Sequence, residues 1–184
     1  MNEQGVLAIA FEDHERVRRL IDAIRYCLEG LSLAFDGWDE PRTKGPGMYV
    51  AVVAGRSIAD HADPMGTNRW PVAESHDVLA DLDSFSEAAT DVALSNDGAV
   101  VVSVDGVVQE QMVRFRDLPE ADAAYADWMG TRHMSALDTS KRESIVATLT
   151  LSQESGRVTL FRDGTYDSVE RDALAARWRT DPDG

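Results

Sequence analysis

The sequence predicts an α/β (α+β) protein in which a mixed central β-sheet is flanked by helices, with an N-terminal helical segment ahead of it. Three observations lead to this fold class. Apolar residues recur at helical spacing near the N-terminus, short valine-rich runs are separated by turn signals, and these runs alternate with further helical stretches. Such an alternation is typical of a sheet covered by helices.

The first predicted element is an amphipathic helix over residues 13–31. A polar, turn-rich loop follows at residues 36–47 (DGWDEPRTKGPG), and residues 48–54 form a predicted buried strand. We expect an irregular connection over residues 55–72 and a short helix over residues 74–82. The apolar face of the first helix comprises Val17, Leu20, Ile21, Ile24, Cys27, Leu28 and Leu31.

The middle of the chain predicts a β-hairpin. Residues 99–104 and the run from Val107 onward are rich in β-branched side chains, and Asp105-Gly106 separates them. Asp-Gly is a strong hairpin signal because both turn positions tolerate positive φ. A helix is then expected from Pro119 through Trp128, with Asp117 as its cap.

The C-terminal third predicts a second pair of strands, over residues 145–151 and 158–161, joined at Ser155-Gly156. Asp163-Gly164 ends the second strand, and a terminal helix is expected over residues 169–179.

Charge and composition exclude several classes of protein. The 184 residues carry 33 acidic and 18 basic side chains, for a net charge of −15, which disfavours binding to nucleic acid or to anionic membranes. No apolar run is long enough to cross a bilayer, and the N-terminus does not resemble a secretory signal, so we expect a cytoplasmic protein. The single cysteine, Cys27, excludes a disulfide framework.

Lysine occurs only at Lys44 and Lys141, and aspartate outnumbers glutamate. This composition suits high salt, where short hydrated carboxylates keep a protein soluble, and it predicts a halophilic source such as a haloarchaeon. The alternative is an ordinary acidic protein that happens to prefer arginine.

Three short motifs are candidates for chemistry. Asp97-Gly98-Ala99 leads into a valine strand, Gly130 to His133 (GTRH) combines a hydroxyl, a guanidinium and an imidazole, and Ser152-Gln153-Glu154 follows an apolar strand. Arginine can grip phosphate oxygens through two hydrogen bonds, and glycine allows close approach of a ligand to the backbone. Each motif also has an ordinary interpretation, respectively a turn before a strand, the polar end of a helix and a hairpin turn.

Taken in order, the motifs resemble the diadenylate cyclase (DAC) domain family. The matching text is DGAVVV (97–102), GTRH (130–133) and TLTLSQESGRVTLFRDG (148–164). The resemblance implies a DAC-like mixed sheet, and an enzyme that condenses two ATP into cyclic di-AMP and two pyrophosphates across two facing protomers. It also implies three parts of the chain: an N-terminal helical segment (1–45), the cyclase domain (46–165) and a C-terminal helix and tail (166–184).

The resemblance assigns catalytic roles to Asp97, Arg132 and His133. Asp97 would contact the ribose and assist attack of its 3′-hydroxyl on the partner ATP, while Arg132 and His133 would bind phosphates. Glu154, together with Asp97, would hold Mn²⁺ or Mg²⁺. The full set of expected ATP-binding residues is Gly98, Ala99, Phe115, Gly130, Thr131, Arg132, His133 and Ser152. Among them, Phe115 would face adenine.

This sequence departs from the family pattern at three positions. Met134 stands where the family usually has a second arginine, so a phosphate contact is missing unless Arg142 or Arg114 supplies it. Asn96 stands where a histidine is frequent, and Gln153 interrupts the usual Ser-Glu-Glu. Two alternatives therefore stay open beside an active cyclase: a catalytically weak protein that senses ATP or cyclic di-AMP, and an interaction module that binds no nucleotide.

Overall fold

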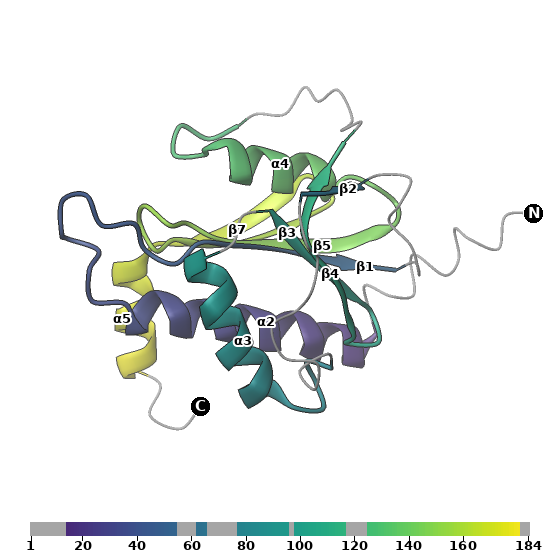
Figure 1. The fold of residues 1–184 in the computed structure, drawn as a ribbon, viewed down its shortest axis with the longest axis horizontal. Coiled ribbons are helices and arrows are strands. Elements are labelled where there is room, and N and C mark those ends of the chain that lie inside the picture. Colours follow the sequence, from purple (N-terminus) through teal and green to yellow (C-terminus); the bar gives the residue numbers. More distant parts are fainter. Residues whose placement is uncertain (1–13, 55–61, 66–76, 96–97, 117–124, 181–184) are drawn as a thin grey trace, which may run out of the picture.

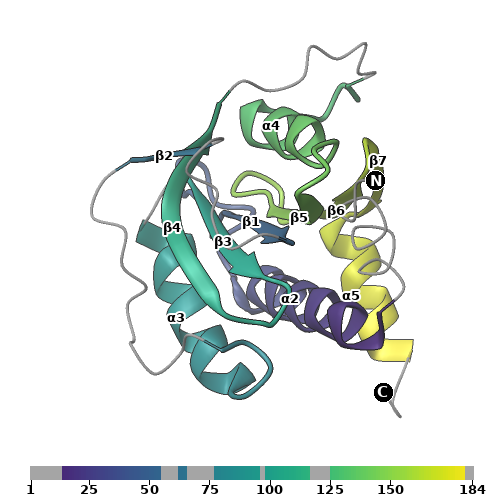
Figure 2. The same ribbon diagram turned by 90° about the vertical axis from the view of Figure 1, so that its right-hand side faces the viewer.

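A computed structural model describes residues 14–54, 62–65, 77–95, 98–116 and 125–180. Their strands form one seven-stranded sheet in the order β2-β4-β3-β1-β5-β6-β7, with β1 parallel to β3 and every other neighbouring pair antiparallel. Helix α4 covers one face, and α2, α3 and α5 lie on the opposite face (Figures 1 and 2). The predicted mixed sheet flanked by helices is confirmed.

Helix α2 (Glu15–Ala34) confirms the predicted N-terminal helix, which begins two residues later and ends three residues later than expected. His14 caps it, since its Nδ1 accepts a hydrogen bond from the backbone N–H of Arg16 at 3.2 Å. The helix packs on β5 (Ile145–Leu151) and β6 (Val158–Arg162), and contacts α3 (Leu82–Ser95) and α5 (Arg171–Thr180). Of the expected apolar face, Leu31 is partly buried and the rest is buried in the core.

Strand β1 (Met48–Val53) occupies the centre of the sheet and is buried on both faces. Because side chains alternate along a strand, Met48, Val50 and Val52 join the core beneath α2 and α3, whereas Tyr49, Ala51 and Val53 join a second core beneath α4. A continuous apolar strand is expected where helices cover both faces of a sheet.

The two predicted hairpin regions are confirmed. Strands β3 (Ala99–Ser103) and β4 (Val108–Phe115) are joined at Gly106, whose φ of 96° favours glycine. Strands β5 and β6 are joined through Gly156, with φ of 73°. Strand β7 (Thr165–Val169) then forms a hairpin with β6 that the sequence analysis missed, because its side chains are mostly exposed and polar.

The helix expected over residues 74–82 is wrong in the part that the structure describes. Asp77 forms an isolated bridge with Val107, and its carboxylate accepts hydrogen bonds from the N–H groups of Leu79 and Ala80, which fixes a turn. The helix begins only at Leu82, where the Asp81 carboxylate accepts from the N–H of Ser84. Such local hydrogen bonds compete with helix and favour caps.

The helix expected from Pro119 to Trp128 falls largely outside the described residues, and its described end, residues 125–128, is not helical and includes a turn at 127–128. Residues 131–133 are instead the first turn of a helix, α4 (Thr131–Thr139), with Gly130 as its N-cap. Within the connection expected at residues 55–72, a short edge strand, β2 (Ala62–Pro64), pairs with β4. Among the described residues, none of the helices combines the length and apolarity that a bilayer span requires.

Candidate functional site

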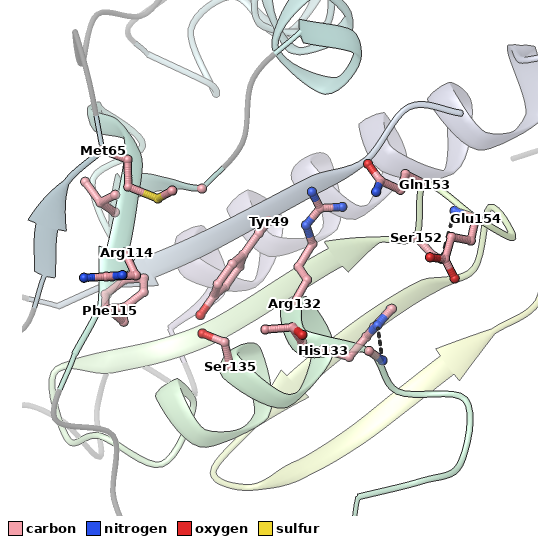
Figure 3. A pocket seen from close by; sticks show the side chains of 14 residues that line it. Tyr49, Met65, Arg114, Phe115, Arg132, His133, Ser135, Ser152, Gln153 and Glu154 are labelled. Carbon is pink, nitrogen blue, oxygen red and sulfur yellow. Dashed lines mark hydrogen bonds between the residues drawn. The ribbon is translucent and has the colours of Figure 1, made fainter. Parts of the chain in front are cut away.

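The topology brings four strand ends to one edge of the sheet. Strands β1 and β3 run parallel, and β4 and β5 run antiparallel to them, so the starts of the first pair lie beside the ends of the second. The N-terminus of α4 lies over this edge (Figure 3). A pocket of about 390 Å³ opens there, a volume in the range of small-molecule sites.

This pocket collects most of the residues expected from the motifs. The expected residues that line it are Gly98, Phe115, Gly130, Thr131, Arg132, His133, Ser152 and Glu154. Ala99 is fully buried in β3 and does not line the pocket. Asp97 lies outside the described residues. Segments separated by tens of residues in the chain therefore meet around one cavity.

The first turn of α4 forms one wall of the pocket. The N–H groups at a helix start have no partner within the helix and carry partial positive charge, so they attract anions. A Cβ at Gly130 would meet no atom of the described residues within 4 Å beyond its chain neighbours and its own helix, so the helix start is open on this side. The hydroxyl-bearing Thr131 and the guanidinium of Arg132 follow directly on the same turn. This wall is suited to a phosphate group.

His133 is neutral at physiological pH, and its orientation identifies the nitrogen that carries the proton. Burial, with the positive charges of Arg132 and Arg157, lowers the pKa of His133 to about 4. Its Nδ1 accepts from the Gly130 N–H at 3.4 Å (dashed in Figure 3), so the proton belongs on Nε2. Nε2 is buried and has no hydrogen-bond partner among the described residues. The Nε2–H group is therefore a hydrogen-bond donor without an acceptor in the described part of the chain.

An aromatic contact with Trp128 holds the His133 ring in place. The Trp128 ring meets it edge to face at 5.1 Å between centroids, and the Arg157 guanidinium lies 4.3 Å from the centre of the Trp128 ring. Arg157 is itself held by Glu170, at 2.7 Å. Arg157 therefore adds positive charge near His133 while remaining anchored outside the pocket lining.

The turn after β5 forms the facing wall. The Ser152 hydroxyl accepts from the Glu154 N–H at 3.4 Å, and the Gly156 N–H donates to the Ser152 carbonyl at 2.9 Å. Ser152 is buried and lines the pocket. Glu154 brings a carboxylate to the same end of the pocket as His133 (Figure 3).

The opposite end of the pocket is apolar and aromatic. The ring centroids of Phe115 and Tyr49 lie 6.0 Å apart, and Met65 and Val113 also line this end. Burial raises the pKa of Tyr49 to about 12, and the hydroxyls of Thr139 and Ser135 lie beside its phenol. Tyr49 was not expected at the site from the sequence, although a tyrosine in a strand of otherwise apolar side chains is a signal that could have identified it.

The position of Met134 matters because arginine is usual there. Met134 is partly buried and packs against the core beneath α4. Of the two arginines considered as substitutes, Arg114 lines the pocket beside Phe115, far from Ser152 (Figure 3), and Arg142 does not line it. The guanidinium of Arg142 instead donates to the Arg116 carbonyl. The positive charges acting on His133 are those of Arg132 and Arg157.

A divalent ion would find one expected ligand in the described residues. Glu154 lines the pocket, but no three His, Cys, Asp or Glu side chains gather into a metal site within the ranges that the structure describes. The second expected ligand, Asp97, lies outside those ranges, directly before pocket residue Gly98. A carboxylate and a nearby hydroxyl are oxygen donors of the kind that Mg²⁺ and Mn²⁺ prefer.

The chain is similar to known proteins in sequence and in fold. Residues 82–166 match the family model described as DisA bacterial checkpoint controller nucleotide-binding. No curated protein matches the chain. Among solved structures, a double mutant of DacA from Staphylococcus aureus is similar at a TM-score of 0.53 and 16% identity, covering 91% of this chain and 97% of that one.

A hypothetical membrane spanning protein from Bacillus cereus is similar at a TM-score of 0.55 and 16% identity. The match covers 82% of this chain and 63% of the Bacillus cereus chain. At this identity the likeness concerns the fold. The matched family segment contains every motif that lines the pocket.

Proposed function

Over residues 82–166 the chain carries the nucleotide-binding domain of the diadenylate cyclase family, and from this premise we propose that it condenses two ATP into cyclic di-AMP. The observation that carries the proposal is the pocket itself. It joins a cationic helix N-terminus and a Ser-x-Glu turn at one end to an aromatic surface at the other. A nucleoside triphosphate is complementary to such a pocket, because it has an anionic end and a flat apolar base.

In the proposed complex, the triphosphate lies at the N-terminus of α4. Arg132 binds phosphate oxygens, His133 donates from Nε2, and Thr131 and Ser152 add hydroxyl contacts. The adenine lies toward Phe115 and Tyr49, where aromatic side chains favour a flat base. Gly98, with a φ of 89°, allows the backbone to approach the nucleotide.

Each half of the reaction makes one phosphodiester bond. The 3′-oxygen of one ATP attacks the α-phosphorus of the other, the bond from the α-phosphorus to the bridging oxygen breaks, and pyrophosphate leaves. Asp97 accepts the proton of the 3′-hydroxyl. Arg132 and neutral His133 stabilise the charge that develops on the phosphate oxygens. The second half repeats these steps with the roles of the two nucleotides exchanged.

Glu154 and Asp97 would hold the Mn²⁺ or Mg²⁺ in this proposal. When bound, the ion supplies neutralisation of the triphosphate charge. That contribution matters in a chain of net charge −15, because ATP approaches against the overall field.

The test is a reaction of purified protein with ATP and Mn²⁺ or Mg²⁺, at low and high KCl, with products identified by mass spectrometry. We expect cyclic di-AMP and pyrophosphate in a ratio of one to two. Asp97→Asn should abolish turnover and leave the circular dichroism spectrum unchanged. A folded, self-associated protein that makes no cyclic di-AMP with either metal would disprove the proposal.

Two protomers are required, because each pocket holds one nucleotide. We therefore propose a face-to-face dimer in the cytoplasm, at least during catalysis. Specific activity should rise with enzyme concentration until the dimer is saturated. Activity strictly proportional to enzyme concentration down to the lowest dilution would contradict a weak dimer.

A second candidate function is a sensor that binds ATP or cyclic di-AMP without turnover. It is favoured by Met134, whose side chain packs in the core where the family usually has a phosphate-binding arginine. Calorimetry would then show nucleotide binding in a protein that forms no product. Absence of binding to either nucleotide would instead favour an interaction module.

A further inference from the structure

Residues 45–47 lie beside the pocket residues Arg132 and Gln153, although they fall outside the segment that the family model matches. All three are buried. The Gly45 N–H donates to the Gln153 carbonyl at 3.0 Å, and the Gly47 N–H donates to the Ala93 carbonyl of α3 at 2.9 Å. Pro46, between them, fixes its own φ and restricts the residue before it. The backbone here is therefore anchored on two sides.

Gly47 makes the closest approach to the site. A methyl group at this position would overlap Nη1 of Arg132 and would come within 2.8 Å of the Gln153 Cβ. Figure 3 shows the Arg132 side chain rising from α4 toward the start of β1, with Gln153 beside its guanidinium. The bare backbone of Gly47 thus forms the surface against which the guanidinium lies.

We propose that Gly47 is a positioning residue, which holds the Arg132 guanidinium in the orientation that binds the triphosphate. This inference rests on the proposed function, since it concerns the same anion site. Arginine has a long side chain that loses rotamer freedom when it binds a ligand. A fixed backbone surface removes part of that freedom beforehand, and such preorganisation favours binding.

Trp38 packs against residues 45–47 and holds this surface in place. Its ring packs directly against Gly45, and a methyl at Gly156 would come within 3.0 Å of it. The Trp38 Nε1–H donates to the Ser32 carbonyl at 2.8 Å, and the Ser32 hydroxyl donates to the Gly156 carbonyl at 2.6 Å. Through Ser32 and Trp38, the end of α2 therefore links residues 45–47 to the turn that carries Ser152 and Glu154.

The test compares Gly47→Ala with Gly30→Ala, whose methyl would meet no protein atom within 4 Å. The closest overlap is with Nη1 of Arg132, the end of a flexible side chain, and the Gln153 Cβ needs only a small shift, so Gly47→Ala should fold with a lower Tm. We expect its Kd for ATP and for inorganic triphosphate to rise about tenfold or more, with the Kd for adenosine unchanged. Gly30→Ala should match the wild type with all three ligands. Equal weakening for adenosine would indicate general damage and overturn the proposal.

A double-mutant cycle tests whether Gly47 acts through Arg132. In the Arg132→Ala background, Gly47→Ala should have no further effect on the Kd for ATP, measured by NMR titration to reach weak affinities. An undiminished effect in that background would overturn the inference.

The thermal stability of the same four proteins separates this inference from the proposed function. Gly47→Ala should lower Tm more when residue 132 is arginine than when it is alanine, whether or not any nucleotide binds. If the wild type binds no ATP, the proposed function fails, and the Tm cycle alone decides the inference. Equal losses of Tm in both backgrounds would overturn it.

Discussion

His133 owes its protonation state to burial and to two neighbouring guanidinium groups. These lower its pKa to about 4, so the folded protein holds the ring neutral while the unfolded chain, at the ordinary value of 6.5, takes up a proton first. Between these values the unfolded state binds more protons, and the free energy of unfolding falls as the pH falls. The same neutral ring carries a buried donor at Nε2, which we propose serves the triphosphate, without adding a charge.

The first residue-scale prediction follows from that difference in pKa. Lowering the pH from 6.5 to 4 should destabilise the wild type more than His133→Asn, which retains an acceptor near the Gly130 N–H. Urea unfolding at a series of pH values measures this, and NMR titration of the ring protons should give a midpoint near 4. Parallel stability profiles for the two proteins would contradict the prediction.

The second residue-scale prediction separates the two ends of the pocket. Arg132→Gln should weaken binding of both ATP and inorganic triphosphate by about tenfold or more, the loss of roughly one charge-assisted hydrogen bond. Arg114→Gln should weaken binding of ATP alone, because Arg114 lies beside Phe115. Calorimetry distinguishes these patterns.

Arg116→Gln is the matched control for these variants. Arg116 is exposed, and its ion pair with Asp63, at 3.4 Å, lies outside the pocket lining. Its variant should bind both ligands as the wild type does, because exposed ion pairs contribute little. A weakening by Arg116→Gln equal to that by Arg114→Gln would point to general electrostatics instead of a contact.

Sequence motifs identified the residues that line the pocket within the family segment, such as Arg132 and Ser152, because their order and spacing are local properties of the chain. They did not identify Gly47 or Tyr49, which reach the pocket only through the pairing of β1 with β3 and β5. The effect of Arg157 on His133 is equally dependent on tertiary packing. Contacts of this kind leave no periodic signal in the sequence.

Among the helices, α2 was predictable and α3 and α4 were not. Helix α2 buries large side chains at regular spacing. The buried face of α3 consists largely of alanines, Ala88, Ala89 and Ala93, whose small side chains give a weak apolar pattern. Helix α4 has nine residues, a length that is marginal in isolation. Its stability therefore comes from packing on β5 and from the hydrogen bond that the Thr148 hydroxyl donates to the Ala136 carbonyl.

The element-scale prediction concerns the contribution of α2 to the fold. Leu20→Ala should lower the free energy of unfolding by about 2–5 kcal/mol, because Leu20 is fully buried between α2 and the sheet. Tyr26→Ala, at a 57% exposed position of the same helix, should change it by about 0.5 kcal/mol or less. Chemical denaturation measures both. A small effect of Leu20→Ala would mean that α2 is dispensable for the fold.

The net charge of −15 belongs to the whole molecule, and it makes stability depend on salt. Raising KCl from about 0.1 M to about 1 M shortens the Debye length from roughly 10 Å to roughly 3 Å, so self-repulsion among the carboxylates should weaken and Tm should rise. The rise should level off above about 1 M, as screening is then complete. A Tm independent of KCl would contradict both the prediction and the proposed halophilic source.

The central position of β1 has a consequence for the order in which the sheet is assembled. Val50 pairs with Val100 on one side and with Leu149 on the other, so β1 lies between strands that are synthesised long after it. During translation it can meet β3 first, and it can pair with β5 only once residues 145–151 have left the ribosome. A fragment that begins at residue 82 would lack the middle strand altogether, exposing two apolar sheet edges that invite aggregation. The segment that the family model matches, residues 82–166, is therefore smaller than the folding unit, which includes β1.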